Sequence, residues 1–200
     1  MAVLTDIFKS TLPPPTRRSE RWKYSPISKL LNSTLSTDSS DIESGFSKEI
    51  APNPIEELEA YRLVFRNGRF DFSLSDLPIA DGVICMPLSE VKAEDAPEFI
   101  NTYSNTEWIG ELNESYHQDG MFLKIARNIK LERPVVVHHL TDGKDVACFP
   151  RHFVRVEEGA EVDVVVWSSA TKNSSGMYNG LLEASIAPNA SLMLEKVCNE

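Results

Sequence analysis

A strand and turn pattern occurs twice in the C-terminal part of the sequence, at residues 156–162 and 186–192. In both copies an apolar residue leads into a polar or proline step, then a Gly or Asn suited to positive φ, and then Ala160 or Ala190. A small alanine after a corner lets successive coils of chain stack closely. The runs that follow both alanines are rich in β-branched or large apolar residues, as buried strands are. This thirty-residue recurrence predicts a parallel β-helix.

A third and fainter copy of the pattern covers residues 129–137, where Pro134 occupies the expected corner. Three coils are about the minimum for a stable stack of this kind. An ordinary antiparallel sandwich is the alternative on these repeats alone, because its turns also recur at short intervals.

The overall composition is that of a globular chain without an attraction for polyanions. The 200 residues are 42% apolar and 25% charged, which allows a sizeable core. The formal net charge of -10 disfavours nucleic acid and anionic membranes as partners. Residues 1–30 differ, with six Lys or Arg against two acids. We expect this short basic segment to be a solvated tail, or a contact for an acidic partner.

Cysteine usage and hydropathy indicate the compartment. Cys85, Cys148 and Cys198 are widely spaced and form no C-x-x-C pair, so the sequence predicts neither a disulfide framework nor a zinc knuckle. The apolar stretches are too short for a membrane span, and no secretory h-region is present at the N-terminus. We therefore expect a reducing, cytoplasmic location, with an organellar transit peptide left open by the hydroxyls and arginines of residues 1–18.

The order of expected elements divides the chain into four parts. A short helix over 3–9, ended by the prolines at 13–15, opens an arm in which Trp22 and Tyr24 are interpreted as a lid on the core of the chain itself. The strongest local signal is Asn67-Gly68 between two alternating apolar runs, which predicts a hairpin. The remaining predictions are a Ser-Pro helix start before residue 27, a helical turn at 55–60, a strand at 82–88, and helices at 93–104 and 107–117. The parts are an N-terminal helical arm at 1–33, a flexible linker at 34–54, a mixed α/β region at 55–118 and the start of a β-helix core at 119–200.

His138, His139 and His152 form the one cluster in the sequence that resembles a metal site. Neighbouring residues on a strand face opposite sides, so His138 and His139 cannot both reach one ion without a bulge. Exposed or edge-strand histidines are the better interpretation. The segment Asp142-Gly143-Lys144-Asp145 resembles the beginning of a calcium loop, but the later ligands are missing and a β-turn explains it.

The cysteines are weak candidates for chemistry. Cys148 lies near Arg151 and His152, which could lower its pKa, but its apolar neighbours favour a buried, inert thiol. Cys198 is a lone thiol near the open end of the last predicted coil. The sequence holds no phosphate-binding glycine loop and no nucleophile elbow, so it favours a scaffold over an enzyme.

Four passages together resemble the SufB/SufD family of iron-sulfur cluster assembly scaffolds, and more closely its SufD branch. They are Glu20-Arg21-Trp22-Lys23-Tyr24-Ser25-Pro26, Leu63-Val64-Phe65-Arg66-Asn67-Gly68-Arg69-Phe70, Leu112-Asn113-Glu114-Ser115-Tyr116-His117-Gln118-Asp119-Gly120, and the Gly-Ala and Asn-Ala corners. The resemblance implies a mainly β fold, with a right-handed parallel β-helix preceded by a small mixed α/β region.

The resemblance also implies a non-catalytic subunit that pairs with a SufB-like paralogue and a SufC-like ABC ATPase. The chain stops at Glu200, roughly halfway through a family member, so the regions that the family uses for cluster formation and for ATPase docking have no counterpart here. No catalytic, cofactor-binding or metal-binding residue is therefore assigned. The iron-sulfur cluster is expected to be handled by the complex.

An unfinished stack of coils has a physical consequence. A β-helix that ends after Val197 exposes unpaired backbone groups and an apolar cross-section, so we expect a fragment or a split subunit whose open end another chain covers. Two other functions stay open at this point. One is a carbohydrate-binding or enzymatic β-helix, for which Trp167 and Tyr178 are few aromatic residues, and the other is a metal-binding β-barrel.

Overall fold

The computed structural model describes six stretches of the chain. They are residues 11–16, 18–25, 27–37, 58–92, 107–172 and 174–199. The expected helices at 3–9 and 93–104 and nearly all of the expected linker at 34–54 lie outside them. No helix within the described residues is both long and apolar enough to span a bilayer.

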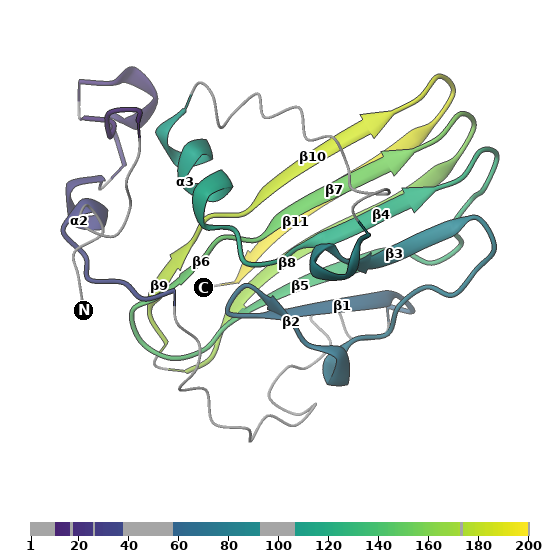
Figure 1. The fold of residues 1–200 in the computed structure, drawn as a ribbon, viewed down its shortest axis with the longest axis horizontal. Helices are drawn as coiled ribbons and strands as arrows, with labels where there is room; N and C mark the ends of the chain where they lie inside the picture. The colour runs from purple at the N-terminus through teal and green to yellow at the C-terminus, as the bar shows by residue number, and fades with distance from the viewer. Residues whose placement is uncertain are drawn as a thin grey trace.

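The described part of the chain is mainly β, as expected (Figure 1). Its strands are β1 Tyr61–Arg66, β2 Arg69–Phe70, β3 Val83–Pro87, β4 Met121–Ile125, β5 Val135–Thr141, β6 Val146–Cys148, β7 Arg151–Val156, β8 Glu161–Ala170, β9 Gly176–Tyr178, β10 Leu181–Ile186 and β11 Ser191–Asn199. Its helical elements are η1 Glu20–Trp22, α2 Ile27–Leu31, η2 Phe72–Leu74, η3 Leu88–Glu90 and α3 Trp108–Tyr116.

The strands form three sheets that run alongside one another (Figure 1). Their orders are β11-β8-β5-β1-β2, β10-β7-β4-β3 and β6-β9. Consecutive strands from β4 onward fall into different sheets, and each pairs in parallel with the strand three positions later in the chain. The antiparallel pairs in the described part are β1 with β2 and β3 with β4. The alternative of an antiparallel sandwich is therefore wrong for residues 121–199.

The corners that carry the sequence repeat stack on one another at one end of the sheets. Asn128, Gly159 and Asn189 occupy equivalent positions with φ of 60°, 68° and 59°. The amide of Asn128 donates to the Glu158 carbonyl at 2.9 Å, and that of Gly159 donates to the Pro188 carbonyl at 3.3 Å. Asparagine and glycine are the residues that best tolerate this left-handed backbone, which explains the pattern in the sequence.

The prediction that Pro134 forms the corner of the third copy is wrong. The structure puts it at Asn128 and not at Pro134. The register gives the reason, because Lys130 pairs with Glu161 while Val135 pairs with Val164. The four residues 131–134 therefore stand opposite the two residues 162 and 163, and this local insertion around Pro134 disguises the repeat in its first copy.

The hairpin prediction at Asn67-Gly68 is confirmed. Both residues have positive φ, 49° and 80°, and the turn joins β1 to β2 with Phe65 opposite Phe70. The Asn67 side chain also mimics a backbone strand: its amide group donates to the Asp142 carbonyl, and its oxygen accepts from the Asp142 amide, both at 2.8 Å. The turn thus ties the hairpin to the loop after β5.

The other local predictions have mixed outcomes. The strand at 82–88, the helix at 107–117 and the helix after the Ser-Pro step are confirmed as β3, α3 and α2. The expected helical turn at 55–60 is wrong in its described part, since residues 58–60 have no helical structure. These residues lead directly into β1, whose first amide, that of Tyr61, donates to the Pro134 carbonyl beside β5 at 3.0 Å.

Two apolar clusters stabilise these elements. The larger one fills the space between the two long sheets, with Leu63, Val137 and Val154 each 0% exposed. The second lies between α3 and the short β6-β9 sheet, around Leu112 and Phe149. Burial of this apolar area is the main term that stabilises the fold.

The N-terminal arm packs on the second cluster. Trp22, Leu30 and Leu31 contact it, which supports the interpretation of the arm as a lid on the chain's own core. Tyr24, by contrast, is 91% exposed. The arm also reaches the edge of the short sheet, where the Ser36 amide donates to the Asp145 carbonyl at 2.7 Å and the Ala147 amide donates to the Ser36 carbonyl at 2.8 Å.

Candidate functional site

The predicted histidine cluster is buried, so the interpretation of exposed or edge-strand histidines is wrong. His138, His139 and His152 are at most 3% exposed. As expected from strand geometry, His138 and His139 face opposite sides of β5. His139 points inward, where its Nε2 lies 2.9 Å from Nε2 of His152 on β7.

The hydrogen bonds around the inward pair fix its protonation. The Met121 amide donates to Nδ1 of His152 at 2.9 Å, so the proton of His152 is on Nε2 and is donated to His139. His139 then carries its proton on Nδ1, a buried atom with no partner among the described residues. Burial lowers the pKa of His152 to about 3, and burial together with neighbouring charges lowers the pKa of His139 well below its ordinary value. Both rings are neutral at pH 7.

This geometry does not suit a metal ion. An ion that two imidazoles bind at about 2.0–2.1 Å holds their nitrogens more than 3 Å apart in tetrahedral geometry. The 2.9 Å between the two Nε2 atoms is that of a hydrogen bond. No group of three or more His, Cys, Asp or Glu side chains in the described stretches is arranged to hold an ion. The pair therefore stabilises the interior.

His138 faces outward and contacts a serine, yet the arrangement is not that of a hydrolase. Arg62 Nη2 donates to His138 Nδ1 at 3.0 Å, so His138 Nε2 carries the proton and donates to Ser169 Oγ at 2.7 Å. A general base must accept the proton of the serine, and this tautomer cannot. Burial and the positive charge of Arg62 lower the pKa of His138 to about 4.

The cysteines and the calcium-like loop also have structural roles. Burial raises the pKa of the Cys148 thiol to about 12, which confirms the inert interpretation. Cys198 is exposed. In the loop after β5, the carboxylate of Asp142 accepts from Thr171 Oγ1 at 2.7 Å, and the Asp145 amide donates to Ser175 Oγ at 3.1 Å. These bonds hold the loop against the loop that follows β8. The segment is therefore a bend stabilised by contacts within the protein, and not a metal-binding loop.

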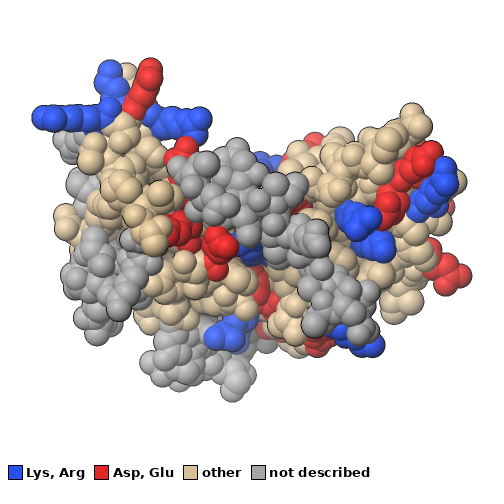
Figure 2. Space-filling view, turned by 45° about the horizontal axis from the view of Figure 1, so that its top comes forward, with Lys and Arg blue, Asp and Glu red and all other residues tan. Residues whose placement is uncertain are grey.

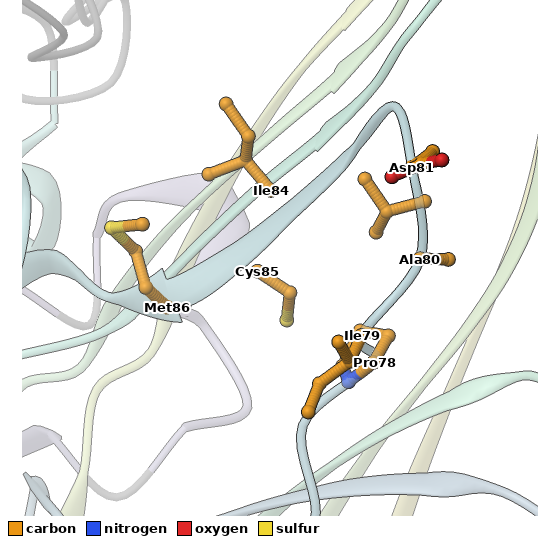
Figure 3. Close-up of a pocket in the computed structure, with 8 residues that line it drawn as sticks. Pro78, Ile79, Ala80, Asp81, Ile84, Cys85 and Met86 are labelled. Atoms are coloured by element: carbon orange, nitrogen blue, oxygen red, sulfur yellow. The ribbon is translucent and has the colours of Figure 1, made fainter.

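A shallow surface groove lies beside β3 (Figure 3). Figure 3 shows the Cys85 side chain on the opposite side of the strand from Ile84. Burial raises the pKa of Cys85 to about 12, so its thiol is not a nucleophile. The lining is otherwise aliphatic apart from Asp81, and it holds no convergent set of polar groups. The groove does not have the composition of a catalytic pocket.

Part of the core is exposed at the end of the stack formed by β9, β10 and β11, the last strands of the described part. We call this surface the open end. Each of these strands is the last in its sheet, and no described strand pairs with its outer edge. Ile186 and Leu194 on its inward-facing rows are 51% and 46% exposed, whereas their counterparts one coil earlier, Val156 and Val164, are each 1% exposed. Apolar core is thus exposed in cross-section at the open end.

The opposite end of the stack is covered. The β1-β2 hairpin extends the sheet of β5, and β3 lies antiparallel along β4. Ser36 covers the edge of β6 by a parallel bridge. The inward-facing residues at this end are more buried than those of β10 and β11, with Leu63 0% and Cys85 8% exposed, although β2 and β3 are themselves the last strands of their sheets.

Charge is mixed on one face of the described part of the molecule. On the face shown in Figure 2, Lys and Arg side chains are interspersed with Asp and Glu, and they form no continuous basic area. Ion pairs such as Arg127 with Glu158 and Lys130 with Glu161, both at 2.8 Å, account for part of this mixing.

Comparison with known proteins identifies the family. The family model described as the SufBD protein N-terminal region matches residues 5–137, well over half of the chain. This chain belongs to the SufBD family. It is 27% identical over 190 residues to the iron-sulfur cluster assembly protein SufD of Escherichia coli (strain K12), an alignment that covers 93% of this chain and 43% of the relative. The chain therefore spans less than half the length of that relative.

The passages that resemble the SufBD family hold the fold together. Asn113 on α3 is 0% exposed and donates to the carbonyls of Pro150 at 3.0 Å and Asn179 at 2.7 Å, which anchors the helix to the sheet corners. The Asp119 carboxylate accepts from the amides of Phe70, Ser89 and Gly120 at 3.4, 3.1 and 2.8 Å. It thereby joins β2, the turn after β3 and the residue before β4.

Sequence reasoning missed one residue at the open end. Lys196 lies on the inward-facing row of β11, opposite Val166, and its Nζ is 5.7 Å from the centre of the Tyr178 ring. The signal was present, because Lys196 has the same strand parity as Leu192 and Leu194. The apolar composition of residues 192–197 favours a buried strand, and that interpretation does not account for the lysine.

Proposed function

We propose that this chain is a non-catalytic scaffold subunit in iron-sulfur cluster assembly. Its membership of the SufBD family and its similarity to the Escherichia coli SufD protein support this role. The observation that carries the proposal is the stack of parallel strands, in which each strand from β4 to β8 pairs with the strand three positions later in the chain. A stack of this kind presents extended surfaces that suit a scaffold.

In this proposal the chain winds as the first coils of a right-handed parallel β-helix. Two observations support that form: the strands from β4 onward pair in parallel, and their corners stack on one another. Parallel crossovers are usually right-handed. The helical arm at 1–33, the linker at 34–54 and the mixed region at 55–118 precede a core at 119–200. A reducing, cytoplasmic location fits the three free cysteines.

The partners in this proposal are a SufB-like paralogue and a SufC-like ABC ATPase. The SufB-like subunit would contact the β-helical part, and the ATPase would contact a region of the family that has no counterpart in these 200 residues. The histidine geometry argues against the alternative of a metal-binding barrel, since the Nε2 atoms of His139 and His152 are already bonded to each other.

Co-purification tests this function. The 200-residue chain, expressed with a SufB-like subunit and a SufC-like ATPase from the same source, is expected to retain the SufB-like subunit directly. The ATPase is expected only when the SufB-like subunit is present. Recovery of the chain without either protein, at concentrations where the three are soluble, would remove the basis for the scaffold role.

A further inference from the structure

We propose that the N-terminal arm around η1 and α2 is a docking surface for an acidic segment of another polypeptide, one that carries several Asp or Glu side chains with an apolar residue among them. This inference goes beyond the proposed scaffold function, because it uses neither the stacked strands nor their edges. The basic composition of the arm by itself leaves two interpretations, a solvated tail or a contact for an acidic partner. The structure favours the second.

The arm is held against the rest of the protein, as a solvated tail would not be. The Glu111 carboxylate accepts from the amides of Thr11 and Leu12 at 2.8 and 2.9 Å. The Trp22 side chain packs against the apolar cluster between α3 and the short sheet. The fold therefore sets the positions of the side chains on η1, so a partner that binds them does not have to order the arm.

The arm presents a group of exposed cations with little acidic charge among them. They are Arg18, Arg21, Lys23 and Lys29. Glu20 is the one acid in residues 18–31 of the sequence. Arg21 pairs with Glu107, whereas the other three cations form no ion pair with a described residue. In the upper left of Figure 2, Lys and Arg side chains project outward from the arm.

An exposed aromatic ring lies beside these cations. Tyr24 is 91% exposed, and Lys23 Nζ lies 5.4 Å from the centre of its ring. Tyrosine and arginine are both enriched at protein–protein interfaces, where a tyrosine ring supplies apolar contact area at a low cost in conformational entropy. The ring next to the cations therefore suits a partner whose carboxylates lie close to an apolar side chain.

The size of this group of cations favours an acidic polypeptide over a nucleic acid or an anionic membrane. Those two present negative charge over a wide area, which the formal net charge of -10 opposes. No continuous basic area extends from the arm on the face shown in Figure 2. A short acidic segment meets mainly the cations within a Debye length, about 8–10 Å, and its carboxylates can accept two hydrogen bonds from the guanidinium of Arg18.

Fluorescence anisotropy with labelled peptides tests the proposal on the 200-residue protein. One twelve-residue probe repeats Glu-Leu-Ser, and a second probe has Gln in place of every Glu. We expect the Glu probe to bind at least about tenfold more tightly at an ionic strength of about 0.05 M. This ratio is expected to fall about threefold or more at about 0.5 M, because salt screens exposed charges. A twelve-nucleotide single-stranded DNA and vesicles of phosphatidylcholine with phosphatidylserine are compared at the same concentrations.

Matched variants identify the residues responsible. Arg18→Glu combined with Lys23→Glu is expected to weaken binding of the Glu probe at least about tenfold. The control combines Lys92→Glu with Lys172→Glu, which change the net charge equally at exposed lysines outside the arm, and is expected to weaken binding less than about twofold. Tyr24→Ser removes the ring without changing the charge, and is expected to weaken binding about threefold. Circular dichroism checks that each variant is folded.

Four outcomes would each overturn the inference. They are equal affinities for the Glu and Gln probes, equal effects of the two double variants, unchanged binding by Tyr24→Ser, and tighter binding of the DNA or the vesicles than of the Glu probe. None of them bears on the scaffold function, which co-purification with a SufB-like subunit tests separately.

Discussion

Gly120 lies where the chain leaves no room for a side chain. A Cβ built on it would stand 1.6 Å from the Arg151 carbonyl oxygen, and its φ is not in the left-handed region, so the constraint is steric. We predict that Gly120→Ala lowers the free energy of unfolding by about 3 kcal/mol or more, because β4 and β7 must separate to admit the methyl group. Urea denaturation measures this change.

Gly143→Ala is the matched comparison for that prediction. Its Cβ would meet Val146 only at 3.6 Å, although φ is +97°. The expected cost is about 1–2 kcal/mol from backbone strain alone. Equal effects of the two substitutions would show that the close approach at Gly120 is relieved without cost.

The buried histidines make stability depend on pH. The pKa of His152 is lowered to about 3 and that of His138 to about 4, from an unfolded value near 6.5. Because the folded pKa is depressed, each neutral ring stabilises the fold fully above pH 6.5, and this contribution is lost as the pH falls toward the folded pKa. The loss is at most about 1.4 kcal/mol per pH unit for each histidine.

We predict that His152→Asn reduces the fall in unfolding free energy between pH 6.5 and 4.5 by about 2 kcal/mol relative to wild type. An asparagine can still accept from the Met121 amide. His138→Gln is a second variant for which the same reduction is expected, should the first not fold. The exposed His117→Asn serves as control, and an unchanged pH dependence in both buried variants would contradict the prediction.

At the scale of elements, two carboxylates, Glu107 and Glu111, join the N-terminal arm to α3. Glu111 accepts from the amide and hydroxyl of Thr11 at 2.8 and 2.6 Å and from the amide of Leu12 at 2.9 Å. Arg21 forms an ion pair with Glu107 at the start of the same helix. The arm therefore depends on α3 for its position more than on its own short helices.

We predict that Glu111→Ala releases the first part of the arm and raises the rate of tryptic cleavage at Arg18 and Arg21 about tenfold. Without the Glu111 carboxylate, the amide and hydroxyl of Thr11 and the amide of Leu12 form hydrogen bonds with water instead. Local opening of the arm then requires less free energy. Glu114→Ala on the same helix is the control. Cleavage rates that do not differ between the two variants would show that the apolar contacts of Trp22 alone hold the arm.

At the scale of the molecule, inward-facing side chains are more exposed on β10 and β11 than on β1 and β3, as Ile186 and Leu194 at 51% and 46% compare with Leu63 and Cys85 at 0% and 8%. The amides of β11 that face the open end lack a neighbouring strand in the described structure, whereas those of β8 lie between β5 and β11. We predict that hydrogen exchange in β9, β10 and β11 is at least about a hundredfold faster than in β8, and that binding of a SufB-like subunit slows it. Mass measurement of the isolated chain accompanies this test. A stable monomer with a protected β11 would show that the open end needs no cover.

The sequence alone determined the features that depend on backbone conformation and on pattern. Asn67-Gly68 predicted its hairpin, and the Gly159-Ala160 and Asn189-Ala190 pairs predicted stacked corners, because few residues tolerate positive φ and few are small enough for close stacking. The resemblance of the four passages to the SufB/SufD family is confirmed, since the chain belongs to the SufBD family.

Only the tertiary structure decided which face each polar residue takes. It placed His139 against His152, Asn113 under the sheet corners and Lys196 inside the row of Leu192 and Leu194. The contacts of His139 and Asn113 join residues far apart in sequence, and the register of neighbouring strands sets them, so a local pattern does not contain them, whereas the face of Lys196 follows from strand alternation. The insertion around Pro134 shows the same limit, because residues looped out of the register become visible only once the partner strand is known.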